Sequence, residues 1–142
     1  MPMTPVVDAV DFVKQHAEIF VGVAAPSAQR VVGELVAEAL AVVSGPVLAR
    51  KVGDWWLVWC RDDWFREHAR DLPRLFHSII PFPEGGRNTS RKEVVLAAFA
   101  SRVVTGLGSE RQWVKGSTTS DPSLEHAVAE HGGNGRFIAF VW

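Results

Sequence analysis

The stretch PVLARKVGDWWLVWC, residues 46–60, carries the clearest information about the fold. Two apolar runs flank Gly53-Asp54, a dipeptide that is typical of a tight β-hairpin turn. The second run alternates between two sets of side chains, and both sets are apolar: Trp55, Leu57 and Trp59 in one, Trp56, Val58 and Cys60 in the other. Successive side chains of a strand point to opposite faces of its sheet, so this strand is expected to lie inside a sheet that is covered on both sides.

The rest of the chain alternates between helical and extended patterns. Apolar spacings of three and four, together with capping residues, predict helices at residues 5–17, 27–43, 71–79, 90–104 and 121–130. The helix at residue 90 is expected to open with a capping box formed by Ser90 and Glu93. Strands are predicted at residues 18–25, 46–52, 55–60, 112–115 and 136–142. We therefore expect an α+β fold, a single-domain two-layer sandwich over residues 1–142 with helices packed on one face of a mixed, largely antiparallel sheet.

The composition favours one globular domain. The chain has 142 residues, of which 47% are apolar, which suits a single core. The formal net charge is −1 and no basic cluster is present, which argues against a nucleic-acid partner. No apolar run approaches the roughly 18 residues of a membrane span, and the N-terminus does not resemble a signal peptide. Because Cys60 is the single cysteine, we expect no disulfide and a reduced, cytoplasmic protein.

The sequence contains no strong catalytic or metal-binding motif. Its five histidines are scattered without HxxxH or HxH spacing, so no metal site is predicted. A GxSxG nucleophile motif and a Walker A loop are both missing from the sequence. Cys60 lies in the apolar, tryptophan-rich strand, where a buried inert thiol is more usual than a nucleophile. No catalytic residue is assigned, and a non-enzymatic role is favoured.

One acidic pattern has two interpretations. Glu34 and Glu38 are four residues apart and therefore lie on one face of the second predicted helix. They form either a solvated stripe on an ordinary core helix or the edge of a site that uses carboxylates. Asp62 and Asp63 follow at the end of the tryptophan-rich strand.

The order of these segments resembles the ATPase domain of the GHKL group, which is shared by histidine kinases and anti-sigma-factor serine kinases. The matching segments are ELVAEAL (34–40) for the asparagine-box helix, LVWCRDD (57–63) for the strand before the Asp-x-Gly box, DLPRLF (71–76) with PEGG (83–86) for the segment that closes over the nucleotide, and EHGGNGRFIAFVW (130–142) for the C-terminal strands. The resemblance implies ATP and Mg²⁺ as ligands. The residues that would bind the nucleotide are Glu34, Glu38, Asp62, Gly85 and Gly86.

The departures from the family pattern fall on the residues that bind nucleotide. Glu38 stands where the family has an asparagine that holds magnesium. Trp64 occupies a glycine position, where its side chain would fill space that adenine needs. The glycine-rich phosphate loop is reduced to Gly85-Gly86. The resemblance therefore implies a degenerate domain that has lost ATP binding and uses no cofactor.

The favoured hypothesis is a small cytoplasmic regulatory domain that binds another protein. The segment WFREHARDLPRLF, residues 64–76, combines aromatic residues with arginines, which are enriched at interaction hot spots. Its candidate contact residues are Trp64, Arg66, Arg70, Arg74 and Phe76. Two alternatives remain, an ATP-binding GHKL protein that acts as a serine kinase or anti-sigma-type regulator, and an immunity-type inhibitor of a toxin. No membrane partner is expected, and homodimer formation stays open.

Overall fold

The computed structural model describes residues 8–116, 121–130 and 134–142 of the chain. Its α-helices are α1 (Ala9–Gln15), α2 (Ala17–Val21), α3 (Ala28–Val42), α4 (Leu72–His77), α5 (Glu93–Phe99) and α6 (Pro122–Ala129). Its strands are β1 (Val47–Val52), β2 (Trp55–Cys60), β3 (Arg102–Leu107), β4 (Glu110–Lys115) and β5 (Arg136–Val141). Two short 3-10 helices are η1 (Arg66–Arg70) and η2 (Pro83–Gly85).

The five strands form one antiparallel sheet in the order β1-β2-β5-β3-β4. The predicted hairpin is present, with Val52 opposite Trp55 across the Gly53-Asp54 turn. The C-terminal strand β5 lies between the two hairpins and pairs with both β2 and β3. Strand β2 is therefore an inner strand, as its two apolar faces predict.

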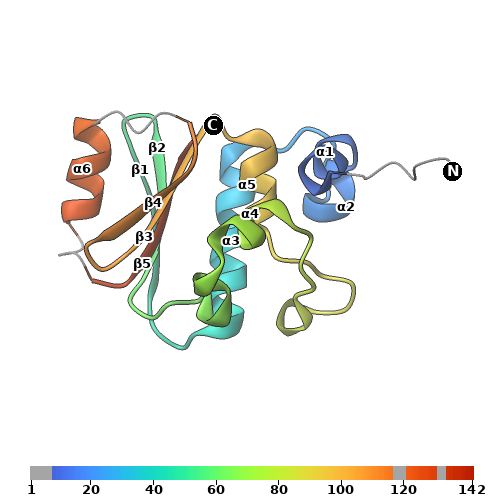
Figure 1. Cartoon of the computed structure of the whole chain (residues 1–142), viewed down its shortest axis with the longest axis horizontal. Helices are drawn as coiled ribbons and strands as arrows, with labels where there is room; N and C mark the ends of the chain where they lie inside the picture. The colour runs from blue at the N-terminus through green and yellow to red at the C-terminus, as the bar shows by residue number, and fades with distance from the viewer. Residues whose placement is uncertain (1–7, 117–120, 131–133) are drawn as a thin grey trace, which may run out of the picture.

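Helices cover both faces of this sheet (Figure 1). Helix α6 packs on one face, against Trp55 and Leu57. Helices α3 and α5 lie on the other face, and α1 and α2 pack farther out beside α5. The predicted single-domain α+β fold is confirmed, whereas the prediction that helices pack on one face only is wrong. The alternation in β2 gives the reason, because a strand with two apolar faces needs a cover on each.

The predicted strand at residues 18–25 is wrong. Residues Ala17–Val21 form helix α2 instead, with Ala17 and Val21 both buried one helical turn apart. Gly22 ends the helix in the left-handed conformation, at φ 79°, and its N–H donates to the Glu18 carbonyl at 3.0 Å. A short run of apolar residues has too few positions to separate a helical period from a strand period.

The predicted capping box and long helix at residues 90–104 are also wrong. Helix α5 begins at Glu93, and Ser90 pairs with Pro81 in an isolated β-bridge rather than capping it. The helix ends at Phe99, and Val103 and Val104 belong to strand β3. The apolar run from residue 94 to residue 104 is nearly continuous, so its pattern does not mark the change from helix to strand.

Three of the other predicted helix starts are confirmed, and the predicted start at residue 5 lies outside the described residues. The side chains of Ser27, Asp71 and Asp121 each accept a hydrogen bond from a backbone N–H in the first turn of α3, α4 and α6, at 3.2, 3.2 and 2.9 Å. Gly132 and Gly133 follow the last predicted helix and are typical of a helix end, but they lie outside the described residues. No helix in the described part of the chain is long and apolar enough to cross a membrane.

Candidate functional site

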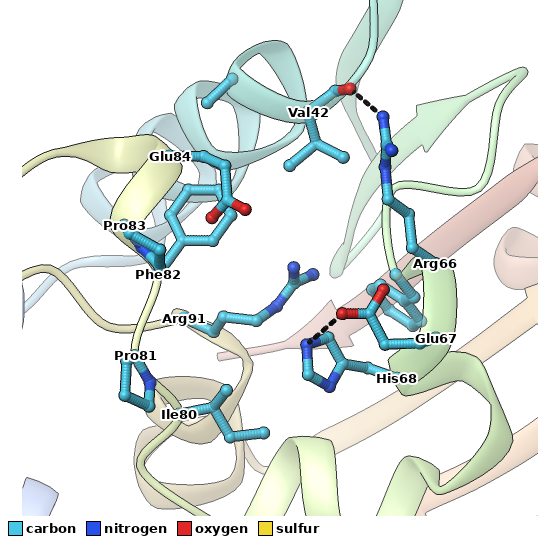
Figure 2. A pocket seen from close by; sticks show the side chains of 12 residues that line it. Val42, Arg66, Glu67, His68, Ile80, Pro81, Phe82, Pro83, Glu84 and Arg91 are labelled. Carbon is cyan, nitrogen blue, oxygen red and sulfur yellow. Dashed lines mark hydrogen bonds and ion pairs between the residues drawn. The ribbon is translucent and has the colours of Figure 1, made fainter.

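Two cavities share lining residues between α3 and the segment that joins α4 to α5. The larger cavity has a volume of about 520 Å³ and is lined in part by Arg91. The smaller one, of about 240 Å³, is lined in part by Glu34 and Lys92. The residues common to both are Ala41, Phe82 and Glu84. The two cavities together are called the α3 groove below, and Figure 2 shows the larger one.

Arg91 is a buried cation in the larger cavity, with a side chain that is only 4% exposed. Its Nε donates to Glu93 Oε1 at 2.8 Å and its Nη2 donates to the Trp64 carbonyl at 3.3 Å. Its Nη2 also lies 3.4 Å from Glu38 Oε2. Burial acts to lower the pKa of Arg91, but the charges of Glu93 and Glu38 raise it above its ordinary value, so the guanidinium stays charged.

Glu38 links helix α3 to this buried charge. Its Oε1 accepts a hydrogen bond from the Lys92 backbone N–H at 2.7 Å, and the residue is 4% exposed. The interpretation as a solvated stripe is therefore wrong for Glu38, whereas Glu34, one turn earlier, is half-buried. Burial is the largest cause that raises the pKa of Glu38 well above its usual range, followed by the neighbouring charge of Glu93.

The cluster of Arg91, Glu38 and Glu93 contains two acceptor atoms that receive no hydrogen bond from a described residue. The Oε2 atoms of Glu38 and Glu93 are both buried, and no described residue donates a hydrogen bond to either. Two carboxylates that are close together inside a protein repel when both are ionised, and this repulsion acts to raise the pKa of Glu38. The raised pKa of Glu38 favours the protonated form of this carboxyl group.

The structure brings together three of the five predicted nucleotide-binding residues. Glu34, Glu38 and Gly85 line the smaller cavity of the groove. Asp62 lies elsewhere, after strand β2, with its carboxylate beside the loop that follows α3. Gly86 does not line either cavity of the groove and instead lines another surface hollow of the same loop segment.

Burial divides the predicted partner-binding residues into two groups. Trp64 and Phe76 are fully buried in the core, so the prediction that they contact a partner is wrong. Their segment is amphipathic, and its apolar side chains turn inward to fill the core. The exposed residues are Arg66, Arg70 and Arg74. Of these, Arg66 lines the larger cavity and donates to the Val42 carbonyl at the end of α3.

The buried charges at the groove are not predicted by the sequence pattern. The sequence pattern predicts no role for Arg91 and Lys92, and it assigns Glu93 to a capping box. All three are buried, and they stand directly before the apolar run 94–100. That position was the available signal, because charged residues at the start of a core helix must either reach solvent or be paired.

Within residues 8–116, 121–130 and 134–142, no three side chains of the types His, Cys, Asp and Glu converge to form a metal site. Comparison of the chain with protein-family models, with curated proteins and with solved structures finds no match. The inference of function therefore rests on the geometry and chemistry of the α3 groove.

Proposed function

We propose that this chain is a regulatory domain that binds another protein through the α3 groove, and that it has no enzymatic activity. The supporting observation is the lining of the groove. Apolar side chains such as Phe82 form its walls, and charged groups of both signs, including Arg91, Lys92 and Glu84, face the same space. A segment of polypeptide carries N–H donors, carbonyl acceptors and side chains for apolar walls, so it complements such a lining.

The size of the groove fits an anchor residue of a partner. Its larger cavity of about 520 Å³ falls within the roughly 300–1,000 Å³ that is usual for pockets that enclose a ligand. Protein interfaces commonly place one or two large side chains in such pockets and surround them with weaker contacts. The exposed Arg66, Arg70 and Arg74 lie on η1 and α4 and would contribute the surrounding contacts.

A photo-crosslinking experiment tests this proposal. Ala37 is exposed and lines the groove, so a benzoylphenylalanine at this position should crosslink to the partner in extracts of the native host. The same group at Ala129, exposed on α6 across the sheet, serves as the control. We expect one adduct from position 37 and none from position 129. An adduct of twice the chain mass would identify a second copy as the partner, and equal labelling at both positions would contradict the groove.

A second candidate is the ATP-binding GHKL protein, which one observation favours. Glu34, Glu38 and Gly85 line one cavity, as the family resemblance implies. However, that cavity is about 240 Å³, smaller than usual ligand pockets, and Glu38 already accepts a hydrogen bond from Lys92. Calorimetry with ATP and Mg²⁺ should give a dissociation constant weaker than about 1 mM, or less than about 4 kcal/mol of binding. A micromolar constant would favour the kinase.

A further inference from the structure

Arg91 has a nitrogen that the protein does not use. Its Nε and Nη2 contact Glu93, Trp64 and Glu38, but none of the described residues accepts a hydrogen bond from its Nη1. Figure 2 shows the guanidinium pointing into the larger cavity, between Glu84 and Glu67. A charged donor that is held rigidly in a nearly dry site forms strong, charge-assisted hydrogen bonds with an anionic acceptor.

The rim of the cavity presents two carboxylate acceptors. The carboxylates of Glu84 and Glu67 lie on either side of the Arg91 guanidinium (Figure 2). A hydrogen bond from its own backbone N–H lowers the pKa of Glu67, with the neighbouring His68 as a smaller cause, so this carboxylate is ionised at neutral pH. The complementary ligand thus has an anionic acceptor at its inner end and an N–H donor next to it.

The walls of the larger cavity, between the Arg91 guanidinium and the carboxylates at the rim, are apolar. The side chains that form them are Ala41, Val42, Phe65, Ile80, Pro81 and Phe82. An aromatic or branched aliphatic side chain would fill this space and remove it from water. A C-terminal residue with an apolar side chain combines all three features. It has a carboxylate, a backbone N–H attached to the same α-carbon, and the apolar side chain itself.

We propose that the larger cavity of the α3 groove binds the C-terminal residue of the partner protein, with its carboxylate on Arg91 Nη1 and its backbone N–H on the rim at Glu84. This inference rests on the proposed function. An internal segment would offer Arg91 Nη1 only a neutral carbonyl, and a charged donor forms a stronger hydrogen bond with a carboxylate. Apolar side chains at the terminus are favoured, since Phe65, Ile80 and Phe82 surround it.

Two matched small ligands test the carboxylate directly. N-acetyl-L-phenylalanine has the shape and charge of a C-terminal residue, whereas N-acetyl-L-phenylalaninamide has the same shape without the charge. In an NMR titration that observes the Arg91 Nε–H and the Ile80 methyl groups, we expect the acid to bind with a dissociation constant on the order of 1 mM. The amide should bind at least about tenfold more weakly, because it forms a neutral hydrogen bond in place of a charge-assisted one. Equal binding of the two, or no shift at either reporter, would overturn the proposal.

A pair of variants checks that the ligand sits in this cavity. Ala41→Phe fills the mouth of the groove from α3, and Leu40→Phe adds the same ring at the neighbouring exposed position, outside the lining. The first variant should abolish binding of the acid and the second should retain it. If both variants bind alike, the acid binds elsewhere and the proposal fails.

Free L-phenylalanine separates the two sources of the same carboxylate. If it binds at least as tightly as the N-acetyl acid, the cavity takes a free amino acid and the C-terminal assignment is overturned. The outcome of the crosslinking experiment is independent of these titrations. A partner crosslinked at position 37 together with equal binding of acid and amide would keep the proposed function and reject this inference alone.

Discussion

Two buried arginines lie close to the same phenylalanine ring, but the protein pairs one of them more completely than the other. The guanidinium carbons of Arg136 and Arg91 are 4.4 and 6.0 Å from the centre of the Phe65 ring. Arg136, on strand β5, holds Asp63 with two hydrogen bonds of 2.9 Å, and its third nitrogen lies 3.4 Å from Thr105 Oγ1. Every nitrogen of this guanidinium therefore has a partner within the protein.

Arg91 is equally buried but incompletely paired. Its Nη1 faces a cavity, and the carboxyl groups beside it keep two buried oxygens without a donor among the described residues. Buried polar groups are nearly always hydrogen-bonded in folded proteins, so an exception needs a cause. The contrast teaches that Arg136 belongs to the scaffold, where it links β5 to the loop after β2. The incompletely paired groups around Arg91 support the binding site proposed above.

The largest expected difference between the two regions is in the free energy of unfolding that is lost when each guanidinium is removed. Arg91→Met leaves Glu38 and Glu93 buried without a cation, so we expect the free energy of unfolding to fall by about 3–5 kcal/mol. Arg136→Met leaves Asp63 alone, and that side chain is 21% exposed and can regain water. A loss of about 1.5–3 kcal/mol is expected there, the usual value for hydrogen bonds to a charged group. Urea unfolding at pH 7 measures both, and equal losses would show that the pairing difference has no energetic weight.

A smaller effect should appear in the pH dependence of stability. Burial raises the pKa of Glu38 well above its usual range, so the folded state holds a proton that the unfolded chain releases near pH 4.3. The stabilisation from this proton is complete below that unfolded pKa and is lost as the pH rises through the raised pKa of the folded state. Over that window each pH unit should remove about 1.4 kcal/mol from the free energy of unfolding.

Glu38→Gln tests the origin of this slope, since glutamine resembles the protonated acid and can still accept from the Lys92 N–H. The variant should match wild type at acidic pH, exceed it in stability as the pH rises, and show a flatter profile. Glu34→Gln, one turn earlier and half-buried, is the matched control and should keep the wild-type slope. Urea unfolding from pH 4 to pH 9 provides the measurement. A slope that survives in Glu38→Gln would assign the bound proton to another group.

The sequence predicted the scaffold better than the groove. Strand β2 has an unambiguous period of two, and the Gly53-Asp54 turn between apolar runs fixes its hairpin partner. Likewise Ser27, Asp71 and Asp121 act as caps through bonds to backbone only a few residues away. Such local interactions are encoded in neighbouring residues, and so they can be inferred without the tertiary structure.

The groove depends on contacts between distant parts of the chain. Glu38 bonds to the backbone of Lys92, fifty-four positions away, and Arg91 bonds to the carbonyl of Trp64. The spacing of Glu34 and Glu38 did identify the correct helix face, but a pair of glutamates at this spacing is compatible with either a solvated or a buried position. Burial of Trp64 could not be inferred for the same reason, because its segment is amphipathic and both its aromatic and its basic residues are typical of interfaces.

A third arginine, Arg66, is exposed, and its replacement should have the smallest effect on the free energy of unfolding. Arg66 stands on the rim of the larger cavity, donates to the Val42 carbonyl, and adopts a left-handed backbone at φ 53°. Arg66→Ala keeps the strained backbone and loses an exposed hydrogen bond, a cost of about 0.5–1.5 kcal/mol. Arg66→Gly loses the same bond but adopts this conformation freely, so it should be more stable than the alanine variant by about 1 kcal/mol. Equal unfolding midpoints in urea would show that residue 66 is not held in the left-handed region. If Arg66→Ala instead lowers the free energy of unfolding more than Arg136→Met does, burial and pairing do not determine how much an arginine contributes to stability in this protein. The contrast between Arg91 and Arg136 then has no energetic support.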